Sequence, residues 1–122
     1  MSTSEIATVL AWHDALSNGD TDTLLALSSE DIEIGDAHGA AQGHAALREW
    51  AGRTAATIEV GDIYYHDGVV VVGERITTKD GEVGTAASAF RVVRDHVTAA
   101  FRHDDLAAAL AATELTEEDL QA

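Results

Sequence analysis

The sequence predicts an α+β fold in which helices pack on one face of a curved antiparallel sheet. In the first half of the chain apolar residues recur every three or four positions, and from about residue 56 the period changes to two. The dipeptides Asp67-Gly68 and Asp80-Gly81 are strong hairpin signals, and a weaker one follows at 94–95. Helices first and a strand meander second indicate an α layer and a β layer around one core.

Three helices are expected in the first half. Ser4 is placed to cap the first helix, and the sequence Asn-Gly-Asp at 18–20 ends it. The expected ranges are about 5–17, 21–27 and 44–54. Between the second and third helices lies a short strand, where Ile32 and Ile34 alternate with acidic residues. A loop containing three glycines is expected at 35–43.

The second half is expected to form four strands that successive hairpins join into an antiparallel meander. The expected ranges are about 57–65, 69–78, 82–93 and 96–103. A last helix is expected at 106–112. The domain prediction is one domain over 1–112, followed by an acidic tail at 113–122 in which Thr116 and Asp119 resemble a capping box.

The strand at 69–72 reads Val-Val-Val-Val and is apolar on both of its alternating sets. A strand with one face in water would alternate apolar and polar residues. Both faces are therefore expected to be covered, one by helices and the other by a second copy of the chain. This predicts a homodimer through the sheet.

The composition excludes several classes of function. Cysteine is absent, which excludes disulfides, thiolate metal sites and cysteine nucleophiles. Asp and Glu total 22 against 7 Lys and Arg, which gives a formal charge of −15. The chain therefore lacks the basic surface that a nucleic-acid binder needs, and an anionic membrane would repel it. No apolar run approaches a membrane span and no signal-peptide pattern follows the first residue, so a cytoplasmic protein is expected.

Three stretches together resemble the nuclear-transport-factor-2-like superfamily, which includes ketosteroid isomerase and the SnoaL-like polyketide cyclases. They read W-H-D-A-L-S-N-G-D at 12–20, D-I-E-I-G-D-A-H-G at 31–39 and G-H-A-A-L-R-E-W at 43–50. The resemblance implies a cone-shaped α+β half-barrel with one apolar pocket, and usually a dimer. Isomerases, cyclases, dehydratases, epoxide hydrolases and non-catalytic binding modules share this fold, so the fold alone does not decide the function.

The similarity to ketosteroid isomerase implies roles for three residues. Asp36 matches the general base, an Asp that moves a proton beside a carbonyl group. Trp12 stands where that enzyme has a Tyr donor, and Ser88 stands where it has a protonated Asp. An indole N–H donates one hydrogen bond, and a serine hydroxyl is a much weaker acid than a carboxylic acid. Trp12 is also typical of a packed core.

Other residues are expected to contact a substrate. His38 lies two positions after Asp36 and could share a proton with it. Trp50, Tyr64 and Phe90 are expected to line the pocket, although aromatic residues at these positions would also pack in a core. Asp36 itself could instead be a turn residue that bonds its own backbone.

The last strand leaves a choice between Arg102 and Phe101 for the pocket. Facing the pocket, Arg102 would be a cation beside Asp36, suited to an anionic substrate or an enolate. The apolar run formed by Val97, Ala99 and Phe101 favours the other face, which would leave Arg102 as a surface charge.

The sequence thus predicts a small cofactor-independent enzyme that transfers a proton on a small apolar carbonyl compound held in the cone. No histidine pair has metal-ligand spacing, so neither a metal nor another cofactor is expected. The alternative is a non-catalytic module of the same fold that binds a small ligand or dimerises.

Overall fold

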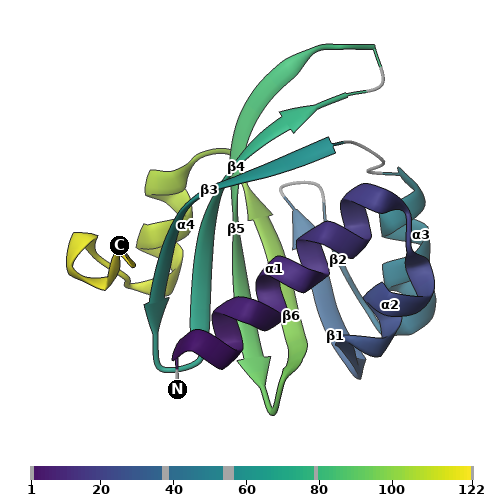
Figure 1. The fold of residues 1–122 in the computed structure, drawn as a ribbon, viewed down its shortest axis with the longest axis horizontal. Helices are drawn as coiled ribbons and strands as arrows, with labels where there is room; N and C mark the ends of the chain where they lie inside the picture. The colour runs from purple at the N-terminus through teal and green to yellow at the C-terminus, as the bar shows by residue number, and fades with distance from the viewer. Residues whose placement is uncertain (1, 37–38, 54–56, 79, 122) are drawn as a thin grey trace.

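The computed structural model of the chain describes residues 2–36, 39–53, 57–78 and 80–121 (Figure 1). The helices are α1 (Ser2–Asn18), α2 (Thr21–Ala26), α3 (His44–Arg53) and α4 (Leu106–Thr113), with a short 3-10 helix η1 (Glu117–Asp119). The strands are β1 (Ser28–Asp36), β2 (Gly39–Gln42), β3 (Thr57–His66), β4 (Val69–Thr77), β5 (Val83–Val93) and β6 (His96–His103). No helix in the described ranges is long and apolar enough to cross a membrane.

The α+β fold class is confirmed, with three N-terminal helices on a curved sheet of order β2-β1-β6-β5-β4-β3 (Figure 1). The meander of β3 to β6 is antiparallel, as predicted. The expectation of a purely antiparallel sheet is wrong, because β1 pairs with β6 in parallel. The predicted loop at 35–43 is also wrong in part, since Gly39–Gln42 returns along β1 as strand β2.

Side chains that accept backbone N–H groups set the starts of two helices. Asp20 caps α2 by accepting from the backbone N of Thr23 at 3.2 Å. The hydrogen bonds from Thr23 hold the pKa of Asp20 below its ordinary value of 3.8. Asp105 caps α4 by accepting from the backbone N of Ala108 at 2.7 Å.

The sheet carries an apolar cluster on each face. The cluster under α1, α2 and α3 takes Val70 and Val72 from β4, and the other face takes Val71, which α4 and the C-terminal segment cover. The chain therefore buries both sets of the valine run by itself, and a second copy is not needed to explain that run. The dimer stays a prediction.

A bulge in β3 decides which tyrosine faces the helices. The pairing of β3 with β4 shifts between Val60 and Ile63, so Ile63 and Tyr65 join Val60 in packing against the helix-facing cluster. Tyr64 packs instead against Val71 in the cluster under α4. The expectation that Tyr64 lines the cone is thus wrong, because an uninterrupted period of two cannot foresee an inserted residue.

The C-terminal segment lies against β3. Leu115 is buried in the cluster under α4, and Leu120 forms an isolated β-bridge with Tyr64. The backbone N–H of Gln121 donates to the carbonyl oxygen of Ile63 at 2.8 Å.

Candidate active site

A histidine and a glutamate form a buried pair between α1 and β4. The Nε2 atom of His13 lies 2.5 Å from Oε2 of Glu74, and their side chains are 2% and 1% exposed. The Nδ1 atom of His13 lies 3.0 Å from the carbonyl oxygen of Val9. Because a carbonyl oxygen only accepts, Nδ1 carries a proton, and the bond to Glu74 requires one further proton between the two side chains. The pair is therefore either imidazolium with carboxylate or imidazole with carboxylic acid, and both forms are neutral overall.

The second oxygen of Glu74 extends this pair across two more strands. The Ser88 hydroxyl on β5 donates to Oε1 at 2.9 Å, and Nε of Arg102 on β6 lies 3.9 Å from the same oxygen. The Arg102 side chain is 20% exposed, and its guanidinium carbon lies 5.3 Å from the centre of the Trp50 ring, a cation–π arrangement. Arg102 thus connects the buried pair to the surface.

The orientation of Arg102 corrects the face favoured by the sequence. Ala100, two residues earlier on β6, belongs to the helix-facing cluster, and Arg102 points to the same side. Phe101 turns to the opposite face and lies over Gly35 of β1, where an added Cβ would come within 2.8 Å of the ring. The missing side chain at Gly35 therefore makes room for the aromatic ring.

Asp36 ends β1 at the level of Arg102. Alternation along β1 puts Asp36 on the same side as the buried Ile34. Gly35 pairs with Phe101 in the parallel ladder, so Asp36 and Arg102 follow next on neighbouring strands. Asp36 is exposed, whereas the His13–Glu74 pair is buried. His38, which the sequence placed beside this carboxylate, lies outside the described residues.

The three predicted aromatic contacts on the helix side pack against one another. The ring centroids of Trp12 and Phe90 are 5.2 Å apart, and those of Trp12 and Trp50 are 6.1 Å apart. The indole N–H of Trp12 donates to the Ser28 hydroxyl at 3.0 Å, so this donor already has an acceptor. Ser88 likewise gives its hydrogen bond to Glu74.

Sequence reasoning did not single out His13 or Glu74 as members of a site. One signal was present: Glu74 shares the alternating set of Val70 and Val72, so a carboxylate follows two valines on a face that is otherwise apolar. A buried carboxylate needs a partner, and that requirement points to a donor across the core.

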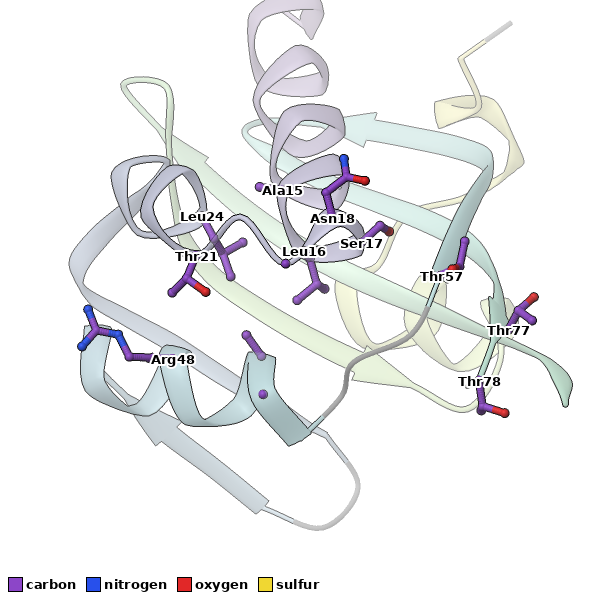
Figure 2. A pocket seen from close by; sticks show the side chains of 13 residues that line it. Ala15, Leu16, Ser17, Asn18, Thr21, Leu24, Arg48, Thr57, Thr77 and Thr78 are labelled. Carbon is purple, nitrogen blue, oxygen red and sulfur yellow. The ribbon is translucent and has the colours of Figure 1, made fainter. Parts of the chain in front are cut away.

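A cavity of about 450 Å³ lies where the C-terminal ends of α1 and α3 meet β3 and β4 (Figure 2). Its apolar lining includes Leu16, Leu24 and Ala51, and its polar lining includes Asn18, Arg48 and several hydroxyl groups. Of the predicted site residues that the structure describes, none lines it. Within the described ranges no group of three or more His, Asp and Glu side chains is arranged to hold a metal ion.

Comparisons with solved structures agree with this architecture. An epoxide hydrolase of the LEH-like type from M. tuberculosis superposes with a TM-score of 0.74 at 18% identity, covering 92% of this chain and 96% of that one. A proposed polyketide cyclase from Xanthomonas campestris gives 0.70 at 21% identity, covering 89% and 96%. A proposed ketosteroid isomerase from Kribbella flavida gives 0.72 at 15% identity, covering 83% and 77%.

At these identities the likeness shows the fold alone, and it is the fold that the resemblance to nuclear-transport-factor-2-like proteins implied. No curated protein matches the chain. The model of the SnoaL-like domain matches residues 9–107, which include the C-terminal part of α1 and the strands β1 to β6. This chain belongs to the SnoaL-like family.

Proposed function

We propose that this chain is a small enzyme that removes a proton next to a carbonyl group, with Asp36 as the base and Arg102 as the cation that holds the resulting enolate. No cofactor takes part in the proposed reaction. The substrate is a small carbonyl compound that reaches the sheet at the exposed ends of β1 and β6.

One observation carries the proposal: Arg102 turns to the helix-facing side of β6, next to the strand end that bears Asp36. A carboxylate and a guanidinium at the same level of neighbouring strands can act on two adjacent atoms of one substrate. The carboxylate accepts a proton from carbon, and the guanidinium donates hydrogen bonds to an oxygen that gains charge.

The buried pair supports this arrangement. Glu74 attracts the guanidinium of Arg102 from within, and Trp50 lies under it. The His13–Glu74 pair is neutral overall, so it orients Arg102 without cancelling its full charge. An oriented cation costs little reorganisation when the negative charge develops.

The Asp36 carboxylate takes the proton on the carbon next to the carbonyl, and the electron pair of the broken C–H bond moves to form the enolate, whose oxygen faces Arg102. Asp36 then gives the proton to another carbon, which yields an isomer. Alternatively the enolate carbon attacks a second carbonyl carbon, the electron pair of that C=O π bond moves to its oxygen, and this oxygen takes the proton from Asp36, which yields a cyclised aldol product.

A non-catalytic binding module is the second candidate, and a specific observation favours it. Trp12, Trp50 and Phe90 pack against one another and fill the helix-facing side of the sheet. If these rings fill the cone, a substrate could bind only at its exposed end, beside Arg102.

Proton exchange separates the two candidates. The chain would be incubated in deuterated water with a panel of cyclic enones and β-dicarbonyl compounds, and loss of the α-proton followed by NMR. Asp36→Asn and Arg102→Gln should each abolish any accelerated exchange, while Asp31→Asn, which removes an exposed carboxylate of the same strand, should retain it. Full exchange by Asp36→Asn would reject the base, and no exchange by the unmodified chain would favour the binding module.

A further inference from the structure

The cavity between α1 and α3 has the size of a small-molecule site and lies apart from Asp36 and Arg102. Its volume of about 450 Å³ falls within the range of roughly 300–1,000 Å³ that such sites occupy. Neither of these two residues lines it. An inference about this cavity therefore does not rest on the function proposed above.

The lining is divided along the length of the cavity (Figure 2). In this view Arg48 lies at one end with its guanidinium turned away from Leu16, and Thr57, Thr77 and Thr78 lie at the other end. This order, from a cation through an apolar surface to hydroxyl groups, matches a molecule with a charged head, an apolar body and a polar far end.

Charge distinguishes this cavity from the rest of the molecule. The chain has 22 Asp and Glu residues and a formal charge of −15, yet none of the described residues that line the cavity carries a carboxylate. Arg48 is exposed and forms no ion pair within the described part of the chain. In so acidic a molecule, an anion meets less repulsion where the lining residues carry no carboxylate and supply a cation.

Gly52 gives an independent reason to regard the cavity as a site. It lies in α3 and lines the cavity, and a Cβ added to it would meet nothing within 4 Å. Its φ is not positive, so its backbone does not require glycine. Glycine weakens a helix relative to alanine. Neither its backbone conformation nor a contact with the described residues requires glycine at this position, whereas an occupant of the cavity would need the space.

We propose that the cavity binds a small amphiphilic anion, with its carboxylate beside Arg48 and its apolar body over Leu16 and Leu24. A hydroxyl or carbonyl group at the far end of this ligand would bond the threonines of β3 and β4.

The hydroxynaphthoate isomer 6-hydroxy-2-naphthoate is a suitable probe, because its carboxylate and hydroxyl lie at opposite ends of a flat apolar bicycle. It should shift the NMR methyl signals of Leu16, Leu24 and Thr77 in a saturable manner. Arg48→Gln should weaken its binding by about twofold to fivefold, as expected for an exposed ion pair. Arg91→Gln, which removes an exposed charge elsewhere, should not. An uncharged dihydroxynaphthalene should bind both variants equally.

Variants that fill the cavity provide a second test of the proposal. Gly52→Leu should abolish binding of the hydroxynaphthoate, while Ala45→Leu, at an exposed position of α3 outside the cavity, should not. Gly52→Ala should bind more weakly than the unmodified chain while its helix melts no earlier, which keeps the test valid if the leucine variant misfolds. Unchanged methyl signals at saturating probe, unchanged affinity in both Gly52 variants, or equal effects of the two arginine variants would overturn the proposal.

Discussion

The hydrogen bond between His13 and Glu74 leads to a prediction about the stability of variants that lose one or both of these side chains. Replacing either side chain by leucine leaves the other in the core without its partner. In Glu74→Leu the Nε2 atom of the imidazole loses its bond, and in His13→Leu the carboxyl group keeps only the Ser88 hydroxyl and the more distant Arg102.

The expected magnitude follows from this geometry. Removing one partner of a buried charged pair costs about 3–5 kcal/mol, whereas replacing both by apolar residues of similar volume is often neutral. The double variant His13→Leu/Glu74→Leu still leaves the Ser88 hydroxyl without its acceptor, which costs about 1–3 kcal/mol. We therefore expect the double variant to be more stable than either single variant. Adding Ser88→Ala to it should recover most of the remaining loss.

Urea unfolding followed by tryptophan fluorescence would measure these differences, because Trp12 contacts His13 at a ring distance of 5.9 Å. With an m-value of about 1–3 kcal/mol/M, a single variant should lower the midpoint by about 1 M or more. Additive losses in the double variant would refute the reasoning, since they would mean that the two side chains contribute independently.

Three further predictions concern β1, α1 and the outer face of the sheet. Gly35→Ala should lower stability by about 1–3 kcal/mol in thermal unfolding, because the new Cβ would lie 2.8 Å from Phe101 and 2.9 Å from the Gly39 carbonyl oxygen; unchanged stability would contradict the close contact. The hydrogen bond that Tyr65 donates to the Glu5 carboxylate raises the pKa of the phenol above its ordinary value of 10.0. Its stabilisation is therefore present below pH 10 and lost as the pH rises through the folded-state pKa, and Glu5→Gln should lower that pKa in an NMR titration. The homodimer predicts a molar mass of twice the monomer value in sedimentation equilibrium at micromolar concentration, and a monomer there would reject it.

Short sequence patterns predicted most of the helices and strands, because the residues at the turns themselves determine the backbone conformation there. Asp67 and Gly68 both have positive φ, at 46° and 80°, the conformation that a two-residue hairpin between right-twisted strands requires. The weaker signal at Arg94 and Asp95 is realised in the same way, with φ of 52° and 64°. In both turns the residues that set the backbone conformation lie directly between the two strands, so a short stretch of sequence is enough to predict the hairpin.

The remaining features depend on contacts between distant parts of the chain. The parallel pairing of β1 with β6 joins segments more than 60 residues apart, so no hairpin turn signal in the sequence predicts it. The bulge after Val60 moves Tyr64 to the face under α4, although the sequence alternates without interruption. The orientation of Arg102 follows from the ring of Phe101 lying over Gly35. A period of two assigns alternate faces, and it does not say which face is which.

The two proposed sites depend on different parts of the fold, and this makes them separable. Asp36 reaches Arg102 only through the register of β1 against β6, which the contact of Phe101 with Gly35 fixes. The cavity depends instead on the space that Gly52 leaves between α3 and α1. A change at Gly35 should therefore alter proton exchange and leave the binding of the naphthoate intact, and a change at Gly52 should do the reverse. If either change affected both, the cavity and the end of β1 would have to be parts of one site.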